Sequence, residues 1–272
     1  VLATDKTGTL TQNHMRVAEL QTGGATFNPQ TETRLPESFH TLAEFSMLAT
    51  PTDPFDPMEQ AIQAFGQQWL QGTEHVHADW TPARAYALSP DILAMTQVFA
   101  RQEPNEHLLA TKGAPEAVMD LCHLDPPGRD ALAAEVLAMA ERGLRVLGVA
   151  QGVWTRSSLG PDGARAPWPD SQHDFTFRFL GLVGFMDPPR AEVPAALAEC
   201  RAAGVRVIMM TGDHPATASA IARQVGLSER PAVLTGPEIA TLDDGALRLR
   251  LRQVDLCARL QPEQKLRLVQ LL

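Results

Sequence analysis

The chain has 272 residues, 44% of them hydrophobic, which is enough to bury the core of one large domain or of two ordinary ones. Lysine and arginine number 23 against 32 acidic residues, so the net charge of -9 gives the surface no general attraction for nucleic acid or anionic lipid. We therefore expect no nucleic-acid partner, and no stretch approaches the roughly 18 apolar residues that a membrane-spanning helix needs.

The predicted elements form three parts. Residues 1–13 begin with a short apolar strand that runs into a polar, turn-forming segment. Residues 14–186 mix helices and strands without a regular order. Residues 187–272 alternate helices and strands, which is typical of a parallel sheet with helices on both faces. In chain order we expect strands at 16–22, 83–88, 94–100, 107–111, 145–153, 175–184, 205–210, 233–234 and 254–258. We expect helices at 37–48, 57–70, 115–121, 129–142, 191–203, 215–225 and from 262. The clearest loop is predicted at 151–174.

A sheet that takes its first strand from the start of the chain and the others from its last third requires an insertion between them. We therefore predict that residues 1–13 and 187–272 form one α/β domain and that residues 14–186 form a second domain inserted after its first strand. The sequence starts at Val1 without a methionine and stops at Leu272 inside an amphipathic pattern. We expect it to be a piece of a longer protein.

Asp5 is the first candidate for chemistry, because it follows a strand at the edge where open α/β sheets hold their ligands. The next residues suit an anion: Lys6 supplies positive charge and Gly8 permits a tight turn. Thr7 and Thr9 add hydroxyls and backbone donors. A carboxylate in this setting can attack a phosphoryl group and form an aspartyl-phosphate. The alternative is a carboxylate that only caps a turn.

The segment DKTGTLT, residues 5–11, matches at every position the phosphorylation signature of the P-type ATPases, ion pumps that pass through an aspartyl-phosphate. Further blocks that resemble this family follow in its order: KGAPE at 112–116, DPPR at 187–190, TGDH at 211–214, and AR at 258–259 with PEQK at 262–265. The resemblance implies a haloacid-dehalogenase-like, doubly wound parallel sheet, incomplete at its C-terminus, with an inserted α+β nucleotide-binding domain built on an antiparallel sheet.

The resemblance also implies the reaction. ATP bound by the inserted domain would transfer its γ-phosphoryl group to Asp5, with Mg²⁺ held by Asp5 and the Thr7 backbone. Lys6, Thr211, Gly212 and Lys265 would complete the catalytic site. Lys265 is predicted in the first turn of a helix, where the helix dipole disfavours a cation, so the residues themselves suggest a compensating anion nearby.

Nucleotide-binding roles follow from the same resemblance, each with a structural alternative. Lys112 and Gly113 would line the adenine and ribose site, although Lys112 alone reads as a surface lysine. Glu59 would face the adenine or be an ordinary first-turn glutamate, and Arg145 would meet the phosphates or be a strand-end charge. Asp213 would touch the nucleotide or cap a helix. The remaining members of this set are Asp187 and Arg190, in a segment that its prolines stiffen into a hinge for closure of the inserted domain.

Two departures from the family pattern stand out. Leu88 and Leu93 occupy the positions where the family has an aromatic residue and a cation for adenine, so we expect apolar contact in place of stacking. The GDGxND motif that supplies a magnesium-binding aspartate is expected beyond Leu272. Without it, the Mg²⁺ ligands implied here are fewer than its octahedral preference requires, and we expect the piece to be inactive or weakly active.

The resulting prediction is the ATP-binding, phosphoryl-accepting part of a cation pump at the cytoplasmic face of a membrane, working with membrane helices, an actuator domain and a transported cation of the parent chain. One alternative is a soluble phosphatase of the same fold, although Thr7 replaces the acidic residue such enzymes use as general acid. Another is a non-enzymatic nucleotide-binding regulator. The eight histidines show no metal-ligand spacing and are expected to be solvated or capping, and the three separate cysteines to be reduced thiols.

Overall fold

A computed structural model of the chain describes residues 1–77, 80–101, 105–156 and 167–272. The chain divides into two compact units. Unit 1 comprises Val1–Met15, Leu137–Arg145 and Met186–Leu272, and unit 2 comprises Arg16–Val136 and Val146–Phe185. Among the described residues, no helix combines the length and the apolar character needed to cross a bilayer.

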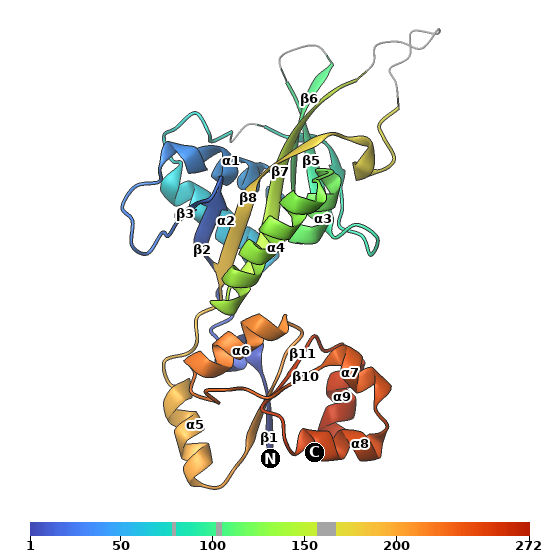
Figure 1. Cartoon of the computed structure of the whole chain (residues 1–272). Coiled ribbons are helices and arrows are strands. Elements are labelled where there is room, and N and C mark those ends of the chain that lie inside the picture. Colours follow the sequence, from blue (N-terminus) through green and yellow to red (C-terminus); the bar gives the residue numbers. More distant parts are fainter. Residues whose placement is uncertain (78–79, 102–104, 157–166) are drawn as a thin grey trace. The chain divides into compact units, whose positions relative to one another are not determined.

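Unit 1 contains a parallel sheet whose strands follow the order β1-β9-β11-β10 (Figure 1). These strands are β1 (Leu2–Asp5), β9 (Val207–Met210), β11 (Leu256–Ala258) and β10 (Val233–Thr235). Leu2 to Asp5 pair in register with Val207 to Met210, so the first strand of the chain lies beside a strand more than 200 residues later. The sequence predicted all four strands, with ends that differ by at most two residues.

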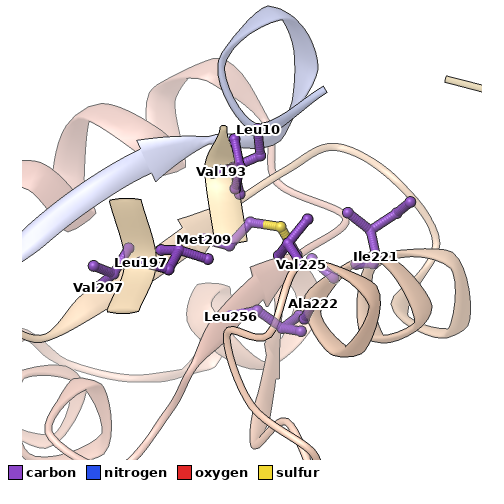
Figure 2. Packing of buried hydrophobic residues seen from close by; sticks show 11 residues of the cluster. Leu10, Val193, Leu197, Val207, Met209, Ile221, Ala222, Val225 and Leu256 are labelled. Atoms are coloured by element: carbon purple, nitrogen blue, oxygen red, sulfur yellow. The ribbon is translucent and has the colours of Figure 1, made fainter. Parts of the chain in front are cut away.

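Helices cover both faces of this sheet, because the side chains of its buried strands alternate between two cores. Val207 and Met209 of β9 contact one core, to which α5 and α6 contribute (Figure 2). Ile208 and Met210 contact the other core, to which α7, α8 and α9 contribute. The helices are α5 (Val193–Ala202), α6 (Pro215–Gln224), α7 (Gly236–Thr241), α8 (Asp244–Leu251) and α9 (Pro262–Leu271).

Two of these helices, α7 and α8, were missing from the sequence prediction. Their capping signals were nevertheless present. Thr235 and Glu238 form a capping box at the start of α7, and the Asp243 side chain accepts a hydrogen bond from the Ala246 N–H at the start of α8. Both helices are short, and short apolar runs separated by glycine and aspartate do not distinguish a helix from a loop by periodicity alone.

Unit 2 is built around a seven-stranded sheet of the order β3-β2-β8-β7-β6-β5-β4, and every pair in it whose register is described is antiparallel (Figure 1). The 3₁₀ turn η2 precedes α1, and α1 and α2 contact each other and this sheet. The strands are β2 (Arg16–Thr22), β3 (Ala25–Phe27), β4 (Pro82–Tyr86), β5 (Ala94–Ala100), β6 (Glu106–Gly113), β7 (Arg145–Thr155) and β8 (Phe177–Met186), and the helices are η2 (Glu37–Phe39), α1 (His40–Leu48), α2 (Pro57–Trp69), α3 (Pro115–Leu121) and α4 (Pro126–Glu141). The end of α4 from Leu137, Arg145 of β7 and Met186 of β8 belong to unit 1.

The loop predicted at residues 151–174 needs correction at both ends. β7 continues to Thr155, paired with β6, because alternate side chains of this segment fit the sheet. Gln172–Asp174 form a 3₁₀ turn whose first N–H groups are capped by Ser171. Residues 157–166, in the middle of the predicted loop, lie outside the described residues.

Candidate functional site

The carboxyl edge of the unit 1 sheet gathers the residues that the sequence singled out from both ends of the chain. Asp5 is the last residue of β1, and Thr211 directly follows β9, its neighbour in the sheet. One oxygen of the Asp5 carboxylate lies 2.9 Å from the Lys265 ammonium, and the other accepts a hydrogen bond of 2.8 Å from the Lys6 backbone N–H. The anion expected near the first turn of α9 is thus the Asp5 carboxylate.

The backbone after Asp5 forms a wide turn over Lys6–Leu10. Gly8 adopts a φ of 77°, which a residue with a side chain rarely adopts, and the Thr11 N–H closes the turn on the Lys6 carbonyl at 3.1 Å. The Lys6 side chain is buried, and its ammonium lies 2.6 Å from the Asp213 carboxylate. Lys6 and Lys265 therefore have different partners. Lys6 pairs with Asp213 inside the loop, whereas Lys265 contacts Asp5, whose side chain is 48% exposed.

The loop after β9 is held by neighbouring backbone groups. The Thr211 N–H donates to the Cys257 carbonyl at 2.9 Å, and the Thr211 hydroxyl accepts from the Asp213 N–H at 3.1 Å. Gly212, the next residue in the loop, is exposed. The helix-capping alternative for Asp213 is wrong, because His214 is the residue whose side chain caps α6, through the Ala216 N–H.

Asp187 and Arg190 form hydrogen bonds with the segment that follows Asp5. The buried Asp187 carboxylate accepts hydrogen bonds from the Thr11 hydroxyl at 2.5 Å and from the His14 N–H at 3.2 Å. The Arg190 guanidinium donates to the carbonyls of Gly8 at 3.0 Å and Thr11 at 3.2 Å. These contacts fix the loop that carries Asp5. They cross some 180 residues of sequence, and no local signal in the sequence pointed to the contact between Thr11 and Asp187.

In unit 2, Lys112 and Glu59 form a buried ion pair. The Lys112 ammonium lies 2.6 Å from a Glu59 carboxylate oxygen and 3.1 Å from the Met95 sulfur. The Lys112 side chain is 4% exposed and that of Glu59 13%, so the surface-lysine alternative is wrong. Burial lowers the pKa of Lys112, and the hydrogen bond and charge of Glu59 oppose that shift.

Asp56 places Glu59 for this contact. Its carboxylate accepts hydrogen bonds from the Met58 and Glu59 N–H groups and so fixes the first turn of α2. Glu59 has the first-turn position that one alternative predicts, and it also pairs with Lys112 on β6.

The structure gives Gly113 a role that the sequence did not predict. A Cβ atom at this position would collide with the Leu93 carbonyl oxygen and the Ala94 backbone of the adjacent strand β5. Leu93 and Leu88 flank a turn closed by reciprocal hydrogen bonds between Ser89 and Ile92, and both leucines are exposed. An apolar surface thus adjoins the strand that carries Lys112, whereas Arg145 is exposed at the first residue of β7.

A sequence model of the family described as "P-type ATPase, cytoplasmic domain N" matches residues 55–192, half of the chain. The chain belongs to the P-type ATPase family. Its relatives include "Probable cation-transporting ATPase I" of Mycobacterium tuberculosis, 34% identical over 97% of this chain and 17% of that protein. "Probable cation-transporting ATPase F" of Mycobacterium bovis is 32% identical over 100% of this chain and 34% of its own length. "Sodium/potassium exporting P-type ATPase cta3" of Schizosaccharomyces pombe is 30% identical over 80% of this chain and 22% of its own length.

The P-type ATPase chain thus spans between about a sixth and a third of the length of these curated relatives. The match to the N-domain model starts two residues before α2, at residue 55, and ends at residue 192, one residue before α5. It contains the Lys112–Glu59 pair and lies mostly in unit 2, whereas Asp5, Thr211 and Lys265 fall outside the matched range.

Proposed function

We propose that this chain is the ATP-binding and phosphoryl-accepting part of a cation-transporting P-type ATPase, with Asp5 as the phosphorylated residue. The observation that carries the proposal is the Asp5 carboxylate itself. It ends a strand at the carboxyl edge of a parallel sheet, is half exposed, and has the Lys265 ammonium at 2.9 Å. A nucleophile for phosphoryl transfer needs this access together with a cation that offsets the incoming negative charge.

In the proposed reaction an oxygen of the Asp5 carboxylate attacks the γ-phosphorus of ATP. The bond from that phosphorus to the bridging oxygen breaks, and ADP leaves with the electron pair. Lys265 and the N–H of the exposed Gly212 would stabilise the transferred group, while Thr211 holds the loop that carries this N–H. Lys6 would act by pairing with Asp213 and keeping the loop in shape.

Asp5 and the Thr7 backbone offer hard oxygen donors, the kind that Mg²⁺ prefers, and this ion usually binds through one or two protein groups together with phosphate oxygens and water. The residues therefore fit Mg²⁺ arriving with the nucleotide, where it would neutralise phosphate charge. Thr7 stands in place of a general acid and cannot readily protonate a leaving group, which favours a persistent phosphoenzyme over the rapid hydrolysis of a phosphatase.

The nucleotide base would lie on unit 2, with its polar edge toward Glu59 and its flat face against Leu88 and Leu93. Lys112 would hold Glu59 in place, Gly113 would let β5 and β6 approach closely, and Arg145 would meet the phosphates. Asp187 and Arg190 would keep the Asp5 segment in position, as their hydrogen bonds to it suggest.

We also propose that residues 1–13 and 187–272 form a haloacid-dehalogenase-like phosphorylation domain, that residues 14–186 are inserted into it, and that the fold is completed beyond Leu272. In the parent protein, at the cytoplasmic face of a membrane, phosphorylation and hydrolysis at Asp5 would drive a cation through membrane helices with the help of an actuator domain. The names of the relatives support cation transport of this kind.

The test has two arms. In a polypeptide that joins this sequence to the rest of its parent, label from γ-³²P-ATP should survive acid quenching, be released by hydroxylamine, and vanish in Asp5→Asn. Lys265→Ala should slow the labelling by about 100-fold, the order expected for loss of one charge-stabilising group. In this chain, ATP should shift the NMR signals of residues around Glu59 and Lys112, equally in wild type and Asp5→Asn. Label that persists in Asp5→Asn would refute the phosphorylation site, and ATP binding with no label at all would favour a regulator.

A further inference from the structure

A cluster of histidine and glutamate side chains lies in unit 2, apart from the residues assigned above. Glu37 belongs to η2, His40 begins α1, and His75 comes from the segment after α2. One ligand atom from each of these three side chains lies within 4.8 Å of the other two. We call Glu37, His40 and His75 the His40–His75 cluster.

Hydrogen bonds to groups that only accept fix the protons of both histidines. His75 Nδ1 lies 2.7 Å from the Glu44 carboxylate, and His40 Nε2 lies 3.2 Å from the Leu35 carbonyl. Since a carboxylate and a carbonyl have no proton to give, both of these ring nitrogens carry the hydrogen. In the neutral rings the lone pairs are then on His75 Nε2 and His40 Nδ1.

Both of these lone-pair nitrogens lie near the Glu37 carboxylate. His40 Nδ1 lies 3.4 Å from one Glu37 oxygen, and His75 Nε2 lies 4.0 Å from the other. His75 Nε2 is buried and makes no hydrogen bond within the described part of the chain. A buried acceptor without a donor costs free energy, and two lone pairs beside a carboxylate repel one another unless a positive charge lies between them.

We propose that the His40–His75 cluster binds a divalent transition-metal ion of the Zn²⁺ class through His40 Nδ1, His75 Nε2 and the Glu37 carboxylate. Two imidazoles and a carboxylate form a common ligand set for this ion. The Glu44–His75 hydrogen bond matches the carboxylate–histidine–metal arrangement in which an outer carboxylate orients a ligating ring. Glu74, with an oxygen 3.9 Å from His75 Nε2, is placed to supply a fourth ligand.

The distances suit an ion that draws its ligands together. Tetrahedral Zn²⁺ with bonds of about 2.0–2.1 Å keeps its ligand atoms about 3.3 Å apart. The His40–Glu37 distance of 3.4 Å already meets that value, and the His75–Glu37 distance of 4.0 Å exceeds it by less than an ångström. The Glu37 side chain is 80% exposed, so it is free to move by this amount.

A bound ion would fasten the segment after α2 to the start of α1, which are 35 residues apart in the chain. Glu44 already begins this connection, because its second oxygen accepts from His77 at 2.8 Å, and the His77 ring stacks on Trp80. The inference does not depend on the proposed ATP chemistry, since Mg²⁺ prefers oxygen donors and has no reason to choose two imidazoles.

The test titrates the metal-free 272-residue chain with Zn²⁺ by calorimetry, in the presence of excess Mg²⁺. We expect one equivalent to bind, and we expect Glu37→Gln and His75→Gln each to weaken it by more than about 100-fold. Glu44→Gln, which removes only the outer carboxylate, should weaken it by about 10–100-fold. His173→Gln is the matched control, because His173 also pairs with an acidic side chain, Asp120, at an exposed site of unit 2.

Histidine ¹⁵N NMR reports which ring atoms bind, and tryptophan fluorescence verifies that each variant is folded. Zn²⁺ should move the signals of His40 Nδ1 and His75 Nε2 and leave those of His173 in place. The Co²⁺ form should show the strong visible absorption of four-coordinate metal. Glu37→Gln leaves the packed side chains untouched, so its result stands even if His75→Gln unfolds. No Zn²⁺ binding, binding that Glu37→Gln leaves unchanged, or binding that His173→Gln removes would overturn the proposal.

Discussion

The buried Lys112–Glu59 pair allows a quantitative prediction for unit 2. Glu59→Gln removes the carboxylate 2.6 Å from the ammonium and leaves Lys112, 4% exposed, without a counter-ion. Breaking a buried ion pair from one side costs about 3–5 kcal/mol. We expect about 3 kcal/mol here, at the lower end, because the lysine nitrogen keeps its contact with the Met95 sulfur and can lose its proton.

The double variant Glu59→Gln/Lys112→Met separates the pair from its surroundings. Lys112→Met alone should cost less than Glu59→Gln, because Glu59 is the more exposed partner and keeps its favourable first-turn position. With both charges removed, no buried charge is left unpaired. The double variant should therefore lie within about 1–2 kcal/mol of wild type, well short of the sum of the single effects.

The pH dependence follows from the direction of the shift. Burial lowers the pKa of Lys112 in the folded state below its ordinary value of 10.5, so between these two values the unfolded chain binds more protons and stability rises with pH. Glu59→Gln removes the negative charge that opposes this shift, so the pKa of Lys112 falls further. Its deficit should be full below that lowered pKa and shrink as pH rises to the folded-state pKa of Lys112 in the wild type, which lies below 10.5.

Tryptophan fluorescence during urea denaturation measures these effects in the right place, because all four tryptophans, at positions 69, 80, 154 and 168, belong to unit 2. Unfolding of unit 1 then leaves the signal largely unaffected. A Glu59→Gln loss below about 1 kcal/mol, or a double variant as unstable as the sum of the single ones, would show that the pair is not buried as described.

Three further effects should be measurable. Gly113→Ala should destabilise unit 2 by more than about 2 kcal/mol, because its Cβ meets the β5 backbone, whereas Gly72→Ala, which meets nothing, should cost about 1 kcal/mol for its positive φ; urea denaturation compares them. Burial raises the pKa of Cys257 to about 12, so a thiol reagent at pH 8 should label it only as fast as unit 1 opens. Asp187→Asn should cost about 1–3 kcal/mol and speed amide exchange at Thr11 and His14, and unchanged exchange there would contradict the bracing contacts.

The sequence predicted elements best where the hydrophobic periodicity agreed with the residues that start and end helices and strands. The strand Arg16–Thr22 has the predicted ends, and α2 begins at the predicted proline, Pro57, after the capping Asp56. The position of Asp5 beside the loop after β9 could be anticipated because carboxyl ends of parallel strands meet at one edge, so the residues at the ends of these two strands had to be neighbours if the strands pair.

The sequence was least informative about contacts between side chains from distant elements. Three histidines expected to be solvated or capping are largely buried: His40 and His75 contact glutamates, and His107 lies in β6 against Trp154 and Trp168. The proximity of these side chains could not be read from the sequence because Glu37 and His75 come from different elements and their meeting depends on how α1 packs on α2.

The two lysines near Asp5 show the same limit at the candidate site itself. Lys6 adjoins Asp5 in the chain, and a sequence pattern naturally assigns it to the incoming phosphate. Its side chain is nevertheless 6% exposed and neutralises Asp213. Lys265 comes from α9, 260 residues away, yet it is the one that contacts the exposed carboxylate. Since α9 starts at the carboxyl edge of the sheet, Lys265 in its first turn lies at that edge. The proposed acceptor site therefore depends on the helix that follows β11 more than on the residue next to the nucleophile.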